Sequence, residues 1–213
     1  MQLGIDVQDD ATQQAAEQVR AHLVSLRGGA PFLSSADGQL LLTWLDAQVP
    51  VAQICAAIEL AADARRKRPS RIPLSLGHAK RHMKKVVVPT RGDATASSGH
   101  PLAPLAKRLQ QERGDAGPVM HELARTLLAL PVDPELAEAG IEAMRLAREA
   151  LWNALSETER TERLDDAMLR LGDLPTGLDP SIIEAAAEEQ ARLEHLGQWP
   201  WLSAHTIWEL ALQ

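Results

Sequence analysis

Aromatic residues and cysteine are scarce in this sequence. It contains five Trp, one Phe and no Tyr, and its single cysteine is Cys55. One cysteine excludes an intramolecular disulfide and is typical of a protein in a reducing compartment. The neighbours of Cys55 are mostly Ala and Ile, and no histidine adjoins it. This setting predicts a buried structural thiol rather than a nucleophile.

Long apolar runs are also absent. No stretch approaches the roughly 18–20 consecutive apolar residues that span a bilayer. The first ten residues, "MQLGIDVQDD", are acidic and lack the basic and apolar regions of a signal peptide. We therefore expect a cytoplasmic protein of bacterial type with no membrane partner.

Signatures of catalytic and metal sites are missing as well. His78 and His82 have helical spacing, but no Cys, Asp or Glu lies within ten residues of them to complete a zinc site. No glycine pattern forms a phosphate loop, and no group of residues combines a nucleophile, a base and an electrostatic stabiliser. We expect a protein that is not an enzyme and that uses no metal and no cofactor.

Alanine and leucine in helical spacing are abundant. They dominate the apolar set while Val, Ile and Thr are sparse, which favours helices over sheets. Capping residues and prolines mark the expected helix starts. These starts are at Ser34 or Ser35, Pro50, Ser75, Asp133, Ser156 and Asp179. The sequence therefore predicts an all-α helical bundle.

A stretch of small and polar residues divides the chain. Residues 91–103, "RGDATASSGHPLA", are rich in Gly, Ser and other small residues, a composition typical of linkers between domains. We predict an N-terminal helical module over residues 1–90 that carries a basic loop and helix. An acidic helical bundle over residues 104–213 follows the linker.

The most unusual feature is the segment "ARRKRPSRIPLSLGHAKRHMKKVVVPTR", residues 64–91. It holds ten Lys or Arg and no Asp or Glu, although the whole chain has a formal charge of −7. The rest of the chain therefore carries −17, which is −7 minus +10. The cations are Arg65, Arg66, Lys67, Arg68, Arg71, Lys80, Arg81, Lys84, Lys85 and Arg91. Such asymmetry indicates a polyanionic partner, or a contact between basic and acidic parts.

On a helical wheel, the part "LGHAKRHMKK" separates into an apolar face and a cationic face. The cationic face consists of Lys80, Arg81, Lys84 and Lys85. Like charges at this spacing repel by a few tenths of a kcal/mol per pair, whereas phosphates would offset the repulsion and release counterions. We therefore predict that the ten cations contact the phosphates of a nucleic acid without reading its sequence. The alternative is an acidic protein surface, of this chain or of another protein, because the rest of the chain carries −17. An anionic membrane is less favoured, because the apolar face lacks the Trp and Phe of membrane-surface helices.

The C-terminal sequence "GQWPWLSAHTIWEL" concentrates Trp199, Trp201 and Trp208. Trp side chains can stack on nucleic-acid bases, but the acidic surroundings would repel phosphate. These residues either cover a helical core or form a hot spot for a protein partner. As candidate partner-binding residues, they would contact another protein or a second copy of this chain.

The segment from residue 32 to residue 85 also resembles a known helical module. "PFLSSADGQLLLTWLDAQVPVAQICAAIELAADARR", followed by "RIPLSLGHAKRHMKK", is similar to the C-terminal helical module of the DnaD/DnaB-type replication proteins of bacteria and phages. The matching positions are Leu33, Ser34, Trp44, Leu45, Val49, Ile54 and Ile58. The Tyr-Ile pair that this family usually carries after its second helix is replaced here by "IPLSLGHA". The resemblance implies binding of single-stranded DNA and a role in remodelling or loading the replication machinery.

Two hypotheses for function follow. The first is a non-enzymatic nucleic-acid-binding accessory protein, associated with DNA replication, that binds the phosphate backbone. The second is a protein–protein adaptor or regulator whose basic segment docks on an acidic protein surface.

Overall fold

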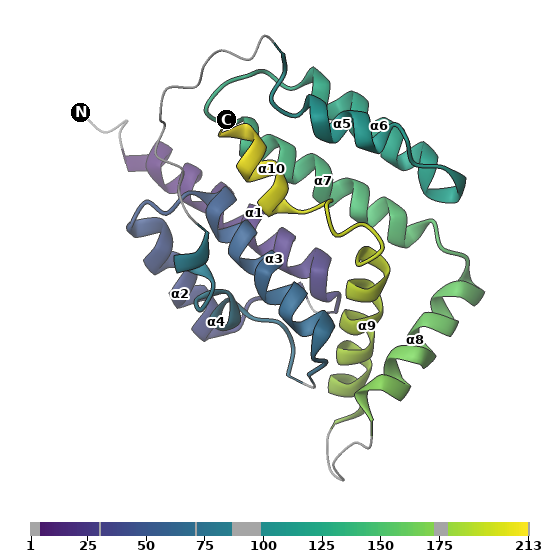
Figure 1. The fold of residues 1–213 in the computed structure, drawn as a ribbon. Helices are drawn as coiled ribbons and strands as arrows, with labels where there is room; N and C mark the ends of the chain where they lie inside the picture. Colours follow the sequence, from purple (N-terminus) through teal and green to yellow (C-terminus); the bar gives the residue numbers. More distant parts are fainter. Residues whose placement is uncertain (1–4, 30, 71, 87–98, 173–178, 213) are drawn as a thin grey trace.

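The computed structural model describes residues 5–29, 31–70, 72–86, 99–172 and 179–212, and in these ranges its regular structure is entirely helical (Figure 1). The α-helices are α1 (Ile5–Arg27), α2 (Ser35–Asp46), α3 (Val51–Lys67), α4 (Leu76–Ala79), α5 (Ala103–Leu109), α6 (Gly117–Ala129), α7 (Leu136–Asn153), α8 (Glu157–Leu171), α9 (Pro180–Leu196) and α10 (Ala204–Ala211). The short 3-10 helices are η1 (Met83–Lys85) and η2 (Gly114–Ala116). The predicted all-α class is confirmed.

Local capping explains where several helices begin. Side-chain caps at predicted positions are Ser34 on α2, Ser156 on α8 and Asp179 on α9. Each accepts a hydrogen bond from a backbone N–H that the first turn leaves unpaired. The exception is α7, which begins at Leu136, after its N-cap residue Glu135. Asp133 instead accepts the Glu135 N–H at 2.9 Å in the preceding turn.

Helix α3 lies at the centre of the packing. It contacts α1, α4, α7, α9 and α10, while the α5–α6 hairpin packs on α7 (Figure 1). Five alanines of α3 are buried: Ala52, Ala56, Ala57, Ala61 and Ala62. Because alanine side chains are small, neighbouring helices can approach α3 closely on several sides. This explains how a single helix contacts so many partners.

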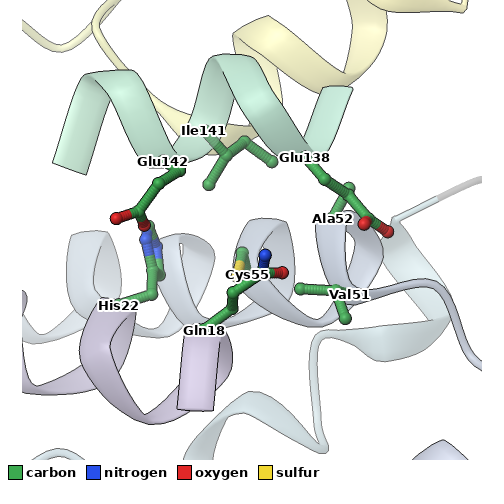
Figure 2. Close-up of a pocket in the computed structure, with 8 residues that line it drawn as sticks. All are labelled: Gln18, His22, Val51, Ala52, Cys55, Glu138, Ile141 and Glu142. Atoms are coloured by element: carbon green, nitrogen blue, oxygen red, sulfur yellow. The ribbon is translucent and has the colours of Figure 1, made fainter. Parts of the chain in front are cut away.

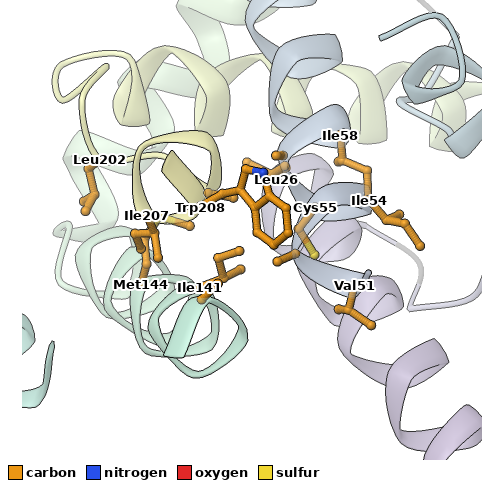
Figure 3. Packing of buried hydrophobic residues seen from close by; sticks show 14 of the residues in the cluster. Leu26, Val51, Ile54, Cys55, Ile58, Ile141, Met144, Leu202, Ile207 and Trp208 are labelled. Atoms are coloured by element: carbon orange, nitrogen blue, oxygen red, sulfur yellow. The ribbon is translucent and has the colours of Figure 1, made fainter. Parts of the chain in front are cut away.

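One hydrophobic core includes helices from both sides of the predicted linker. Figure 3 shows Trp208 of α10 beside Leu26 of α1, Cys55 of α3 and Ile141 of α7. The predicted division into two helical modules therefore does not correspond to two separate cores. The reason is that the apolar face of α10 is covered by α3 and α7 together. Of the predicted linker, residues 91–98 lie outside the described residues.

A smaller cluster joins α8 to the rest of the molecule. Its buried members are Trp152, Ala167, Leu171, Ala186, Ala187 and Ala191. They come from the end of α7, one face of α8 and the middle of α9. Helix α8 packs mainly against α9, so it lies at the edge of the molecule (Figure 1).

A buried ionic group ties three helices together. Glu59 of α3 is bound by Arg148 of α7 through both guanidinium Nη atoms, and His22 Nε2 of α1 lies 3.2 Å from Glu59 Oε1. Arg148 also donates to the carbonyl of Leu202. Burial by itself would raise the pKa of Glu59, but the Arg148 charge and His22 outweigh it and lower that pKa to about 2. Glu59 is therefore ionised and paired at neutral pH.

Two glycines permit close approaches between helices. Gly28, just after α1, has a φ of +68°, and a Cβ there would lie 2.6 Å from the Glu188 carboxylate of α9. A Cβ at Gly140 of α7 would lie 2.9 Å from Ile207 of α10. The Glu188 carboxylate is the end of a flexible side chain and can move aside, so Gly28 is required mainly for its positive φ, whereas a side chain at Gly140 would push α7 and α10 apart.

No helix in the described ranges combines the length and the apolar character needed to cross a bilayer.

Candidate nucleic-acid interface

The basic segment runs back along α3 after leaving its C-terminal end. At one end, Arg65 of α3 donates to the carbonyls of Ser70 and Ile72. At the other end, Gln53 in the first turn of α3 donates to the Val86 carbonyl at 3.3 Å. Residues 53 and 68 are 15 positions apart, which at 1.5 Å per residue corresponds to about 22 Å of helix. The cations are therefore distributed along most of the length of α3.

Three hydrogen bonds fix the middle of this segment. Glu189 of α9 accepts the Leu74 N–H at 2.7 Å, and Arg27 of α1 donates to the Leu74 carbonyl at 3.4 Å. The Gly77 N–H donates to Asp37 of α2 at 3.4 Å. Contacts from three different helices thus hold the loop and α4 in place.

The predicted continuous helix over "LGHAKRHMKK" is interrupted. Helix α4 ends at Ala79, a turn follows, and η1 spans Met83–Lys85. Neighbouring like charges weaken a regular helix, and η1 has the tighter 3-10 form. The predicted separation of faces is nevertheless present, because Leu76, Ala79 and Val86 are buried while the four cations point outward.

Six of the predicted phosphate-binding residues are exposed. They are Lys67, Arg68, Lys80, Arg81, Lys84 and Lys85, called the basic face below. Within the described residues, none of the six has a carboxylate oxygen within 4.0 Å. In the described part of the molecule, no ion pair therefore joins the basic face to an acidic residue.

The other predicted cations differ from these six. Arg65 is buried, and its Nε lies 2.8 Å from Glu189 Oε1, so it holds the loop instead of facing a ligand. This corrects the prediction that Arg65 contacts phosphate. Arg66 is half-buried and pairs with Asp63 at 3.0 Å. Two further candidates lie outside the described residues: Arg71 and Arg91.

The two histidines of the segment add no charge at neutral pH. Burial and the nearby cations Arg65 and Arg81 lower the pKa of His78. Burial, Lys85 and Arg81 likewise lower the pKa of His82. His78 Nδ1 lies 2.8 Å from Ser75 Oγ at the start of α4, where it completes the cap. In the described ranges, no group of three or more His, Cys, Asp or Glu is arranged to hold a metal ion.

The three candidate partner-binding tryptophans are engaged within the molecule. Trp208 is only 6% exposed and lies in the main core, which corrects its assignment to a binding surface. Trp199 is half-buried and its Nε1 donates to Glu112 at 3.3 Å. Trp201 is half-buried beneath the Arg108 guanidinium, 4.4 Å from the ring centre. Covering the helical core is the main role of these side chains.

A hollow between α1, α3 and α7 is small and partly open. Figure 2 shows Gln18, His22, Cys55 and Glu142 around it. It has room for about one water molecule. Burial raises the pKa of the Cys55 thiol well above its ordinary value, so the thiol stays protonated and unreactive. The hollow is therefore too small for a substrate, and the prediction of a structural cysteine agrees with its burial.

Sequence reasoning missed Glu189, which organises the basic segment from a position more than one hundred residues away. Only its place among the alanines of α9 indicated that its side chain faces inward. No family model, curated protein or solved structure matches this chain. The likeness to DnaD/DnaB-type proteins therefore rests on the quoted residues alone and stays a prediction.

Proposed function

We propose that this chain is a non-enzymatic nucleic-acid-binding accessory protein that acts in the cytoplasm, in DNA replication or a related process. The basic face would contact the phosphates of the backbone. The single observation that supports the proposal is a row of six exposed cations without carboxylate partners in the described residues. Nothing in this arrangement reads bases, so we expect little dependence on sequence.

The position of the cations favours an extended polyanion over a small anion. They follow α3 over about 22 Å, and phosphates of one B-form strand rise about 3.4 Å each, so about six phosphates match this length. A small anion would need cations converging on one point. The anchored backbone of the segment also reduces the conformational entropy that binding would remove.

The proposal predicts a steep dependence on salt. If all six cations displace counterions, the logarithm of the binding constant falls with the logarithm of salt concentration at a slope of up to about −5. Binding of a fluorescent duplex of arbitrary sequence, followed by anisotropy, should weaken by about 10³-fold between 50 and 200 mM salt.

The decisive variant reverses Lys80, Arg81, Lys84 and Lys85 to Glu. Removing four phosphate contacts should abolish measurable binding at the lowest salt used, because the new carboxylates repel the backbone. A control with the same change in charge reverses four exposed cations elsewhere, Lys107, Arg113, Arg125 and Arg170, of which Arg125 pairs with Glu122 and Arg170 with Glu194. Both variants change the net charge from −7 to −15, since each substitution removes two units. Equal losses in the two variants, or no wild-type binding at low salt, would refute the proposal.

The adaptor hypothesis uses the same basic face for a different partner. In that case the intact chain would fail to bind nucleic acid at low salt but would bind an acidic polypeptide. Polyglutamate is a suitable probe, with the same two quadruple variants as the comparison. If the chain binds polyglutamate and does not bind nucleic acid, the adaptor hypothesis replaces the nucleic-acid proposal.

A further inference from the structure

Helix α8 exposes an apolar surface on the side away from α9. Leu169 is 79% exposed and Met168 is 37% exposed, while Ile182 at the start of α9 is 41% exposed. An open hollow at this site is lined by Asp165, Met168, Leu169 and Gly172. Figure 1 places α8 at the edge of the molecule, where α9 and Trp152 at the end of α7 cover its inner face. Apolar side chains gathered on an exposed helix are typical of interaction surfaces.

The same side of α8 is acidic. Glu162, Asp165 and Asp166 are exposed, and in the described part of the chain none has a cationic nitrogen within 4.0 Å. These three acids with Met168 and Leu169 are called the α8 face below. A partner for this face needs cations placed beside exposed apolar side chains, because both kinds of group must be matched.

This chain carries such a surface itself. Lys67 and Arg68 at the end of α3 are exposed, and Ile72 in the following loop is 68% exposed. Phe32, the only phenylalanine, is 76% exposed. Arg27 holds these segments together, because it donates to the carbonyls of both Phe32 and Leu74. Lys67, Arg68, Ile72 and Phe32 are called the loop face below.

The α8 face and the loop face of one molecule cannot contact each other. Helix α9 lies between α8 and the end of α3, since it contacts both of them (Figure 1). Glu189 on α9 binds the loop directly, whereas the α8 face is on the far side of α8 from α9. The complementary surfaces therefore point in different directions.

We infer that the α8 face of one copy of this chain docks on the loop face of a second copy. The contact pairs three acids with two cations and covers the exposed side chains of Leu169, Phe32 and Ile72. It is heterologous, so each added copy leaves one α8 face and one loop face free. Association is therefore open-ended and rises with protein concentration. It also covers Lys67 and Arg68, so a bound polyanion and a second copy compete for them.

Sedimentation velocity on the full chain over a concentration series tests this inference. At low salt the average mass should rise above the 23.2 kDa of one chain, and at high salt it should return to that value. Each of two variants gives the α8 face and the loop face the same sign of charge, so that the two faces repel each other. The first is E162K/D165K/D166K on the α8 face, and the second is K67E/R68E on the loop face. Each variant alone should remain a monomer at low salt.

Mixing the two variants gives the sharpest result. In the mixture both faces of the first variant are basic and both faces of the second are acidic, so the two should assemble alternately into open-ended chains with equal numbers of each, which neither variant forms alone. The matched control E122K/D133K/E135K reverses three exposed acids on α6 and the α6–α7 connection, and it should associate like the wild type. Circular dichroism of each variant checks that it is folded.

Three outcomes would overturn the inference. One is a wild-type chain that stays a monomer at low salt over its full range of solubility. Another is association that the two face variants leave unchanged, which would locate the contact elsewhere. The third is a monomeric chain whose α8 face binds polylysine, which would assign that face to a different basic protein. Nucleic-acid binding is measured separately, so the failure of one proposal leaves the other open.

Discussion

At the scale of single residues, the buried side chain of His195 makes the stability of the protein depend on pH. It is 5% exposed on α9 and packs edge-on against Trp152, at 6.0 Å between ring centres, and against Trp199, at 5.5 Å. Burial and the nearby charge of Arg163 lower the pKa of His195 from 6.5 to about 4. The folded state therefore holds this imidazole neutral, while the unfolded chain protonates it near its ordinary pKa.

This difference predicts a loss of stability in acid. The pKa of His195 is lower in the folded protein than in the unfolded chain. Its contribution to the free energy of unfolding is therefore complete above about pH 6.5 and declines as the pH falls toward 4. Between pH 7 and pH 5 the free energy of unfolding should fall by about 2 kcal/mol from this residue. Urea denaturation at the two pH values measures it.

The variant His195→Phe isolates the effect. Phenylalanine keeps an aromatic ring between the two tryptophans and removes the titrating group, so the loss between pH 7 and pH 5 should shrink by about 2 kcal/mol. His205→Phe, at a partly exposed position on α10, is the control and should retain the wild-type loss. Identical pH dependence in wild type and His195→Phe would show that the imidazole titrates normally in the folded state.

At the scale of elements, the basic segment depends on a carboxylate from a distant helix. Glu189 binds Arg65 Nε at 2.8 Å and the Leu74 N–H at 2.7 Å. Burial raises the pKa of Glu189, and Arg65 acts against that rise by favouring the charged form. The same pair explains why Arg65 differs from its exposed neighbours: removing it from water needs a buried partner of opposite charge.

Glu189→Ala should loosen the start of the basic segment. The substitution leaves the Arg65 charge buried without its partner, which costs about 3–5 kcal/mol of stability. Hydrogen exchange at the Leu74 amide should become much faster, whereas amides in the middle of α7 should stay protected relative to global unfolding. The double variant R65M/E189L, with no buried charge at this place, should recover most of the stability. Unchanged protection of the Leu74 amide would show that other contacts hold the segment.

At the scale of the whole molecule, one core and two charged regions determine the behaviour of the chain. The main core takes side chains from α1 and α3 and from α7 and α10, and the Glu59–Arg148 pair crosses the same boundary. The segment that carries the basic face packs on this core, and this packing fixes the spacing of its cations. Cutting the chain at the predicted linker should therefore destabilise the fold of residues 1–90.

A fragment of residues 1–90 should fail to fold by itself. Without α7, α9 and α10, the apolar residues of α3 lose the helices that bury them, and Glu59 loses Arg148. We expect low helicity by circular dichroism and no cooperative thermal transition. Addition of a fragment of residues 99–213 should restore helicity if the two pieces reassemble. A cooperative transition of the first fragment alone would support the two-module prediction instead.

The sequence by itself determined the local features of this protein. Three features follow from spacing, side-chain chemistry and composition over short stretches. They are the helical class, the caps at Ser34, Ser156 and Asp179, and the outward position of most cations of the basic segment. Each of these depends on residues within a few positions of one another. Periodicity could therefore predict them without knowledge of how the helices pack.

Only the tertiary structure decided which side chains meet. Arg65 was indistinguishable from Arg68 in the sequence, yet Glu189 makes one a buried anchor and leaves the other exposed. Trp208 became part of the core because α10 packs on α3. Helix α8 kept an exposed acidic face because α9 and the end of α7 cover only its other face. Such pairings join residues far apart in the chain, and their energy comes from burial and charge compensation in space, which short-range periodicity does not encode.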